Sequence, residues 1–173
     1  MTDPLLNHLL RTLAAVPPAT RVVDLACDDG GRLALLARLG LDVWACAEAE
    51  ADVGAARAAL GVVLGAAEAQ RRVTPARPEA LGYPDAFADW AVLRAGALAP
   101  AALHGALEEA RRVLAPGGWL VLAVSALPDA ADGLDRLAAG AGLAVAEPPA
   151  PEILDGAPWL RAIYRRVDPG TPL

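Results

Sequence analysis

The chain has 173 residues, enough for one domain with a single core and too few for two ordinary domains. Its 15 basic residues, all arginine, are outnumbered by 21 acids, and the net charge of −6 disfavours binding to a nucleic-acid backbone. No apolar run reaches the roughly 20 residues that span a bilayer and no secretory leader is visible, so we expect a cytoplasmic protein without a membrane segment.

The N-terminal half predicts one lone helix and then two strand–helix units. Leucines at helical spacing indicate an amphipathic helix over residues 3–16, which the pair Pro17-Pro18 ends. The short apolar runs 21–27 and 41–47 are typical of buried strands, and each precedes a run with helical spacing. These helices are expected over residues 33–39 and 52–60.

The C-terminal half continues the alternation and ends in a hairpin. Proline at 116 and glycines at 117 and 118 separate a predicted helix from a fully apolar predicted strand. The last two strands, residues 143–146 and 160–167, are expected to form a hairpin whose wide loop is the proline-rich segment 148–158. The remaining strands are expected over residues 72–75, 89–93 and 119–124, and the remaining helices over residues 100–114 and 129–139.

Apolar strands that alternate with helices of about ten residues predict an α/β fold. We expect a three-layer α/β/α sandwich built on a Rossmann-like, mostly parallel sheet with an antiparallel C-terminal hairpin strand. A single domain over residues 1–167 would be followed by a short tail over residues 168–173. Ligands of such sheets bind beyond the carboxyl ends of the strands, where the strand order reverses, so the site is expected at the turn after the first strand.

Three segments in this order resemble the motifs of class I S-adenosylmethionine-dependent methyltransferases. Residues 22–30, V-V-D-L-A-C-D-D-G, are similar to V-L-D-L-G-C-G-x-G, and residues 81–90, L-G-Y-P-D-A-F-A-D-W, resemble L-P-F-P-D-x-S-F-D-L. Residues 108–122 are similar to the segment E-x-x-R-V-L-K-P-G-G-x-L-V-L. The resemblance implies the fold of that family, S-adenosylmethionine as the cofactor, and methyl transfer to a small-molecule substrate.

The resemblance also implies cofactor-binding residues, most of which lie at strand ends. In the family the turn after the first strand consists of small residues, because the methionine part of the cofactor lies against the main chain there. The family's acid for the ribose hydroxyls matches Ala47, so Glu48 would replace it only if the strand has already ended. Arg77 stands where the family has an acid for the adenine amino group. The implied cofactor-binding residues are Asp24, Ala26, Asp28, Gly30, Glu48 and Glu79.

Three departures from the family pattern support an alternative. The Asp28 side chain could crowd the cofactor, Ala47 cannot bind a ribose, and Arg77 reverses the charge expected beside the adenine. A non-catalytic binding or scaffold protein that has lost the cofactor is therefore a second hypothesis. A nicotinamide-dependent dehydrogenase is a weaker one, because no Gly-x-Gly-x-x-Gly sequence follows the first strand. No catalytic base is assigned, because methyl transfer depends mainly on positioning.

Four polar side chains have two interpretations each. Arg94 would either hold a substrate carboxylate or be a solvated loop arginine, and His104 would be either a general base or a solvent-facing helix residue. Tyr83 and Asp85 lie in a loop that borders the cofactor in the family, or they are ordinary loop residues. The exposed terminal hairpin would allow a homodimer.

The cysteines and tryptophans are interpreted as structural. Cys27 and Cys46 are expected to be reduced core residues, and the absence of a neighbouring histidine disfavours a zinc site. Trp159, at the start of the last strand, is expected to be partly exposed. The tryptophans expected to fill the core are Trp44, Trp90 and Trp119.

Overall fold

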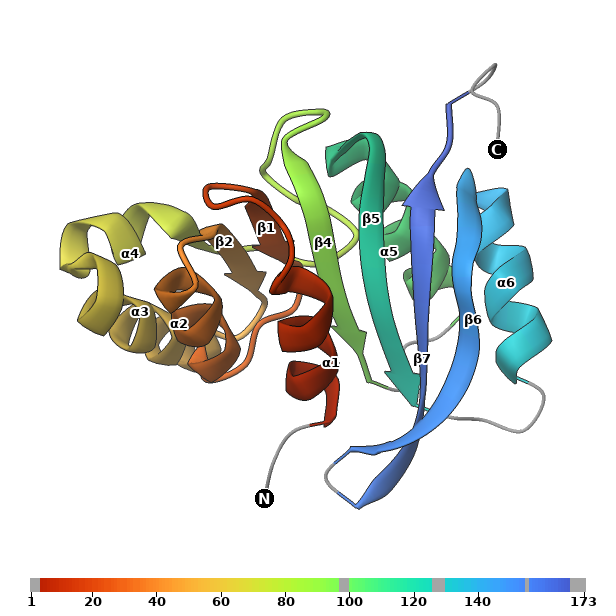
Figure 1. Cartoon of the computed structure of the whole chain (residues 1–173), viewed down its shortest axis with the longest axis horizontal. Coiled ribbons are helices and arrows are strands. Elements are labelled where there is room, and N and C mark those ends of the chain that lie inside the picture. Colours follow the sequence, from red (N-terminus) through yellow and green to blue (C-terminus); the bar gives the residue numbers. More distant parts are fainter. Residues whose placement is uncertain (1–3, 97–99, 126–129, 155, 169–173) are drawn as a thin grey trace.

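The computed structural model describes residues 4–96, 100–125, 130–154 and 156–168. These residues contain one seven-stranded sheet, whose arrangement is shown in Figure 1. The strands follow the order β3-β2-β1-β4-β5-β7-β6. The first five strands pair in parallel, whereas β7 is antiparallel to both β5 and β6. The strand order therefore reverses between β1 and β4, and the predicted fold class is confirmed.

The helices and strands have the following bounds. The strands are β1 (Arg21–Asp24), β2 (Asp42–Ala47), β3 (Val73–Pro75), β4 (Ala88–Ala95), β5 (Leu114–Ser125), β6 (Leu143–Leu154) and β7 (Ala157–Arg166). The helices are α1 (Pro4–Leu13), α2 (Gly31–Arg38), α3 (Glu50–Leu64), α4 (Ala66–Arg72), α5 (Pro100–Val113) and α6 (Ala130–Gly140).

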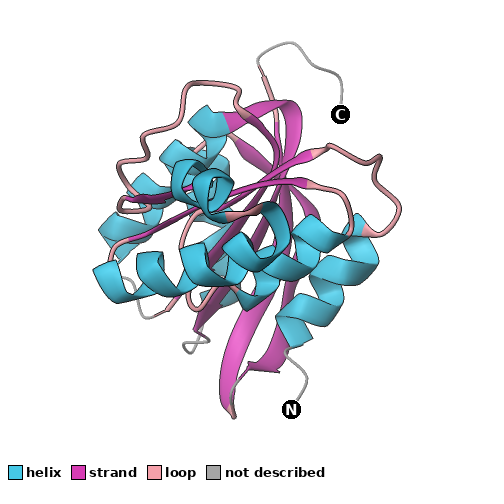
Figure 2. Cartoon of the chain, turned by 90° about the vertical axis from the view of Figure 1, so that its left-hand side faces the viewer, coloured by secondary structure: helices cyan, strands magenta, loops and turns pink. Residues whose placement is uncertain are grey.

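Helices cover both faces of the sheet (Figure 2). Each face has its own apolar core. On one face α1 inserts Leu5, Leu9 and Leu13, which lie at four-residue spacing, into a cluster shared with α2 and α3. On the other face α5 and α6 pack against the sheet through residues such as Leu107 and Leu134. Among the described residues, no helix is both long and apolar enough to cross a membrane.

The predicted wide loop over residues 148–158 is wrong, because most of this segment belongs to β6 and the start of β7. Pro151 is paired with Leu160, and the strand shifts register twice, between Val145 and Glu147 and again before Ala150. Proline lacks a backbone N–H, but β6 lies at the edge of the sheet, where one side of the strand needs no partner. Helix α4, which the sequence did not predict, fills the connection before β3.

Two predicted segments fall partly outside the described residues. The helix expected from residue 129 begins at Ala130 in the structure, and residue 129 itself lies outside the described ranges. Of the predicted tail, only Asp168 is described, and its carboxylate contacts Arg111 at 3.3 Å and Arg166 at 3.1 Å. Residues 169–173 lie outside the described part, so the domain boundary stays a prediction.

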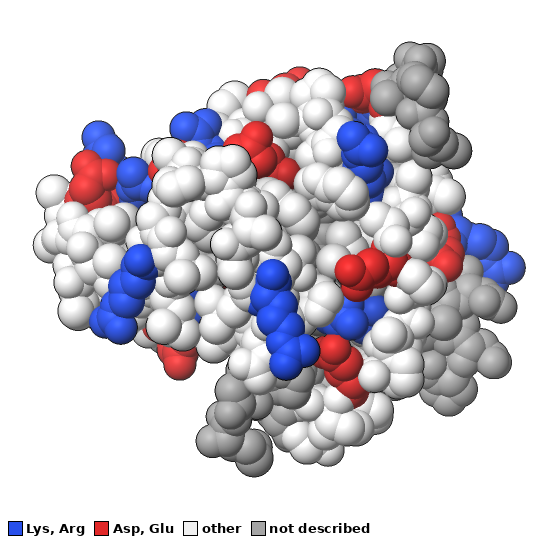
Figure 3. Space-filling model, in the orientation of Figure 1, with Lys and Arg blue, Asp and Glu red and all other residues white. Residues whose placement is uncertain are grey.

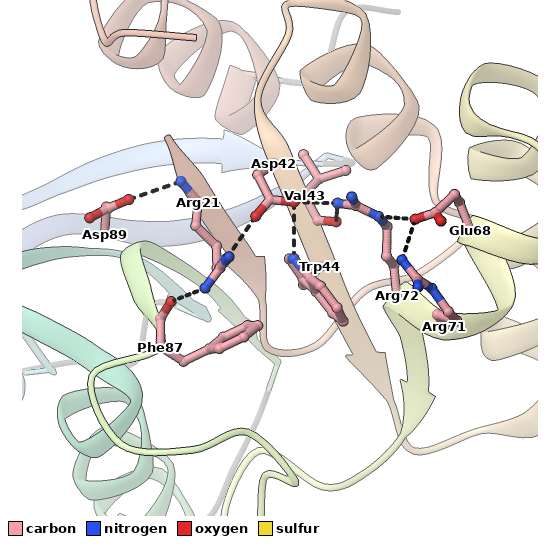
Figure 4. Close-up of polar contacts among 9 residues, drawn as sticks. All are labelled: Arg21, Asp42, Val43, Trp44, Glu68, Arg71, Arg72, Phe87 and Asp89. Carbon is pink, nitrogen blue, oxygen red and sulfur yellow. Dashed lines mark hydrogen bonds and ion pairs between the residues drawn. The ribbon is translucent and has the colours of Figure 1, made fainter. Parts of the chain in front are cut away.

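A network of alternating charges joins the amino-terminal ends of the central strands (Figure 4). Asp42 of β2 accepts hydrogen bonds from Arg21 Nε at 2.7 Å, from Trp44 Nε1 at 3.1 Å and from Arg72. Arg72 in turn contacts Glu68 at 3.0 Å. Burial alone would raise the pKa of Asp42, but the hydrogen bonds from Arg21 and Arg72 outweigh burial and hold this pKa below its ordinary value.

Replacing Asp42 with asparagine is expected to lower the free energy of unfolding by about 2 kcal/mol at pH 7, because two arginines lose an ionised acceptor. A carboxyl group with a lowered folded-state pKa stabilises the protein above its unfolded pKa, and this contribution is lost as the pH falls through the folded value. The difference between the two proteins should therefore shrink below about pH 4. Urea titrations of both proteins at pH 7 and pH 3 measure this difference in the free energy of unfolding. An equal difference at the two pH values would show that the ionised Asp42 carboxylate is not its cause.

Candidate functional site

A pocket of about 580 Å³ opens at the carboxyl ends of β1, β2 and β4, next to the point where the strand order reverses. Its volume is within the range of small-molecule sites. The wall is formed by residues 25–28, 47–49, 52, 78–79, 93–96 and 159. Except for Trp159, these segments lie at or just after the carboxyl ends of the parallel strands β1, β2, β3 and β4, so the pocket lies where the sequence predicted a ligand site.

Asp28 lines the pocket, and two arginines hold its carboxylate. Its Oδ2 atom lies 3.2 Å from Arg32 Nη1 of α2 and 3.3 Å from Arg94 Nη1 of β4. The guanidinium of Arg94 also lies over the ring of Trp159, 5.0 Å from the ring centroid. The side chain that was expected to crowd the cofactor therefore has a defined position between two cations. Arg94 is half-buried in β4, so the solvated-loop interpretation is wrong.

Asp24 and Arg32 form a buried ion pair behind the turn. The side chains of both residues are 5% exposed, and Arg32 Nη2 lies 3.3 Å from Asp24 Oδ2. The other carboxylate oxygen of Asp24 accepts a hydrogen bond from the backbone N–H of Ala26 at 3.2 Å. Burial raises the pKa of Asp24, and the Arg32 guanidinium opposes that rise. Asp24 thus stabilises the turn through buried contacts and does not line the pocket, whereas Ala26 does.

Gly30 is required by packing between α2 and α3 and does not line the pocket. Its φ of +77° is in the left-handed region, where side chains are disfavoured. A Cβ atom at this position would lie 2.5 Å from the Cα atom of Ala56 in α3. The glycine therefore allows α3 to approach the turn closely.

The other two predicted contacts, Glu48 and Glu79, both line the pocket. Strand β2 ends at Ala47, so Glu48 lies beyond the strand, which is the condition under which it could replace the missing acid. Glu48 forms an exposed ion pair with Arg77 at 3.0 Å. This pair joins the segment after β2 to the segment after β3 at the rim of the pocket.

Among the charged and aromatic residues of the pocket wall, Asp52 and Trp159 were not predicted from the sequence. Asp52 lies in the first turn of α3 and was interpreted only as a helix residue. Trp159 was expected to be partly exposed, but it is buried at 9% exposure. Because β7 runs antiparallel to β5, with Trp159 paired to Ser125, the start of β7 lies at the carboxyl end of β5. The antiparallel direction of the last strand was the signal that could have placed Trp159 in the site.

The remaining candidates lie outside the pocket wall. Tyr83 is buried and its hydroxyl donates to the carbonyl oxygen of Ala45 at 2.7 Å, while Asp85 contacts Arg112 at 2.7 Å. Burial raises the pKa of the Tyr83 hydroxyl. His104 is paired with Glu108 on α5 at 3.5 Å. These side chains stabilise the loop before β4 or the surface of α5.

The cysteines and the other tryptophans have structural positions. Cys27 and Cys46 are both buried and unpaired, and Cys27 also reaches the pocket wall. Burial raises the pKa of both thiols. Within the described residues, no group of three or more His, Cys, Asp or Glu side chains is placed to bind a metal ion. The half-buried tryptophans that pack against the two cores are Trp44, Trp90 and Trp119.

The sheet order, the antiparallel β7 and the pocket define a Rossmann-like domain of the class I methyltransferase type. The sequence matches a family model described as a methyltransferase domain over residues 23–122. The chain therefore belongs to this methyltransferase family, as the resemblance predicted. A search of curated proteins gave no significant match.

Solved structures with the same fold have low sequence identity to this chain. The S-adenosylmethionine-dependent methyltransferase of Methanosarcina mazei has a TM-score of 0.72 at 14% identity, over 96% of this chain and 98% of that chain. The [4+2]-cyclase SpnF has a TM-score of 0.75 at 15% identity, over 95% and 80% of the two chains. The geranyl diphosphate C-methyltransferase of Streptomyces coelicolor A3(2), in complex with Mg²⁺, geranyl diphosphate and S-adenosylhomocysteine, has a TM-score of 0.70 at 14% identity, over 94% and 78%. The family and its methyltransferase relatives indicate S-adenosylmethionine as the cofactor.

Proposed function

We propose that the protein is an S-adenosylmethionine-dependent methyltransferase that acts on a small-molecule substrate. The observation that carries this proposal is the charge at the pocket wall, where four carboxylates outnumber the three guanidinium groups of Arg94, Arg32 and Arg77 that lie against them. Such a wall attracts a ligand with a net positive charge, as the sulfonium nucleoside has, and disfavours the pyrophosphate of a dinucleotide. The charge thus supports methyl transfer over a dehydrogenase reaction.

The residues of the pocket fit the parts of the cofactor. The turn at Ala26 offers bare backbone and a small side chain to the methionine part. Glu48 and Asp52, at the end of β2 and the start of α3, are the carboxylates that would accept hydrogen bonds from the ribose hydroxyls. Glu79 is the carboxylate that the segment after β3 contributes to the wall. When bound, S-adenosylmethionine supplies an electrophilic methyl group.

The apolar part of the wall would keep water from the reacting atoms. Leu25, Leu93 and the buried ring of Trp159 line the pocket. In-line displacement depends mainly on how donor and acceptor are positioned, so no general base is required of the chain. The substrate is expected to be small, because the family match and the two cores use most of the described residues.

Calorimetry with S-adenosylmethionine, S-adenosylhomocysteine and NAD⁺ tests the proposal. We expect both sulfur nucleosides to bind and NAD⁺ not to bind. Raising the salt concentration from about 0.05 to about 0.5 M should lower the affinity for S-adenosylmethionine about threefold and the affinity for S-adenosylhomocysteine less, because only S-adenosylmethionine has a net positive charge. A donor at 100 times its dissociation constant should stabilise the fold by about 2.7 kcal/mol.

A non-catalytic binding protein is the second candidate function. The Glu48–Arg77 ion pair at the rim supports it, because it engages the acid that would otherwise accept from the ribose. No stabilisation by either sulfur nucleoside at millimolar concentration would favour this candidate.

We further propose a monomeric protein of a reducing compartment such as the cytoplasm. The two buried cysteines form no disulfide, as is usual where thiols stay reduced.

The edge strand β6 contains Pro148, Pro149 and Pro151, which cannot donate a backbone hydrogen bond to a neighbouring strand and so oppose the homodimer predicted from the hairpin. On the face shown in Figure 3, the described arginines are scattered singly, which offers no basic patch to a nucleic acid there.

A further inference from the structure

We propose that a second pocket, at the amino-terminal ends of β1, β4 and β5, binds an alkylammonium group. This amino-end pocket has a volume of about 260 Å³ and is lined by residues 16, 17, 20, 89, 90 and 115–119. It lies at the opposite ends of the parallel strands from the pocket at Ala26 and Glu48, so the inference does not depend on the proposed function. The volume is slightly below the usual range of sites for drug-sized ligands, which favours a small group.

Two tryptophans of neighbouring strands form an aromatic stack at this pocket. Trp90 of β4 is paired in register with Trp119 of β5, and their ring centroids lie 5.6 Å apart at an interplanar angle of 15°. Arg165 of β7 is paired with Trp119, and its guanidinium lies over the Trp119 ring, 5.2 Å from the centroid. The stack therefore already attracts one cation to the electron-rich face of an indole ring.

The second ring face of Trp90 is the site for a further cation. One face of this ring is turned to Trp119, whereas β1 is the neighbour of β4 on the side away from β5. The segment before β1 contributes Pro17 and Thr20 to the pocket wall, so the pocket extends along that side of Trp90. Trp90 is half-buried, and indole is the aromatic group that binds cations best.

A carboxylate lies on the same side of the pocket. Asp89 directly precedes Trp90, is exposed and lines the pocket. Its Oδ2 atom accepts a hydrogen bond from the backbone N–H of Arg21 at 2.9 Å, which holds the carboxylate between β4 and β1. None of the described residues that line this pocket is basic, so the wall has a net negative charge. An indole face beside a carboxylate suits an alkylated ammonium group, which has a diffuse positive charge and an apolar surface.

The test is an NMR titration of the isotope-labelled chain with choline and with 3,3-dimethylbutan-1-ol, which has the same shape and no charge. The chain has four tryptophans, and their indole N–H resonances report where a ligand binds. Choline should bind with a dissociation constant on the order of 1 mM and shift the resonances of Trp90 and Trp119. The neutral alcohol should bind at least about fivefold more weakly, because it lacks the attraction to the ring and to Asp89.

Variants of the two groups should have graded effects on the affinity for choline. Trp90→Phe should lower it about threefold and Trp90→Leu more than about tenfold, because phenyl is a weaker cation site than indole and an alkyl group is none. Asp89→Asn should lower it about threefold, since the amide oxygen can still accept from Arg21 N–H but has no charge. Glu50→Gln is the control, because it makes the same charge change at an exposed position in the first turn of α3 and should leave the affinity unchanged. Thermal unfolding of each variant confirms that the fold is kept.

A short peptide with one trimethyllysine, titrated beside choline, identifies the source of the ammonium group. Binding about tenfold tighter than that of choline would indicate a methylated protein side chain, whereas equal binding would indicate a free amine.

Four outcomes would overturn the assignment. Equal affinity for choline and the neutral alcohol would show that the pocket does not recognise charge, and an unchanged affinity in Trp90→Leu would show that this ring is not the site. A shift of the Trp159 resonance in place of the Trp90 resonance would locate the cation in the other pocket, which Trp159 lines. No shift of any indole resonance at about 50 mM choline would show that the chain has no such site.

Discussion

Replacing Arg32 with methionine is expected to lower the free energy of unfolding by about 3–5 kcal/mol at pH 7. Methionine fills a similar volume but removes the cation next to Asp24, whose side chain is only 5% exposed. A carboxylate buried without its cation is costly, and the hydrogen bond from Ala26 N–H compensates only a part of that cost. Urea denaturation would measure the change.

The pH dependence of this loss gives a second criterion. Burial raises the pKa of Asp24, and without Arg32 the main opposing influence is gone. A carboxyl group whose folded-state pKa is raised costs nothing below its unfolded pKa, and it destabilises the protein as the pH rises through the folded value. The variant should therefore lose less stability at pH 5 than at pH 7.

Two further variants distinguish the loss of the Asp24–Arg32 ion pair from an unspecific loss of stability. Adding Asp24→Asn to Arg32→Met should recover part of the loss, because the second substitution removes the isolated charge. Arg38→Met, at the exposed end of the same helix, should change the stability by no more than about 0.5 kcal/mol. A double variant no more stable than Arg32→Met would show that the pair is not the cause.

Gly30→Ala is expected to destabilise the protein by about 3 kcal/mol. The new Cβ would lie 2.5 Å from the Cα atom of Ala56, so α3 would have to move away. The left-handed backbone at φ +77° adds a conformational cost for any residue with a Cβ. Thermal and urea unfolding measure the effect.

Gly54→Ala is the matched control on the helix that Gly30 contacts. A Cβ at Gly54 meets nothing within 4 Å, and the exposed position is inside α3. Alanine should therefore stabilise the helix by about 1 kcal/mol. If both alanine variants had the same small effect, close packing at Gly30 would not be the reason for its glycine.

The order of helices and strands could be predicted from the sequence because their patterns are local. Alternating apolar strands and helices predicted the parallel sheet, and the turn after the first strand marked the site. The course of β6 could not be predicted, because proline discourages strands everywhere except at a sheet edge or a bulge. Sequence alone does not say which strand will be the edge.

The chemistry of the site was less predictable than its place. Asp24, Arg32, Asp28 and Arg94 form one chain of ion pairs, but Arg94 is 66 residues away from Asp28 in the sequence. Contacts of this kind depend on which strands are neighbours, and a motif does not record that. For the same reason Trp159 was expected to be partly exposed, although the direction of β7 places it in the pocket.

A crystal structure of the protein with S-adenosylhomocysteine tests the central claim most directly. We expect the nucleoside in the pocket between Ala26, Glu48 and Trp159. An empty pocket at a concentration that saturates binding in solution, or a nucleoside bound elsewhere on the molecule, would contradict it.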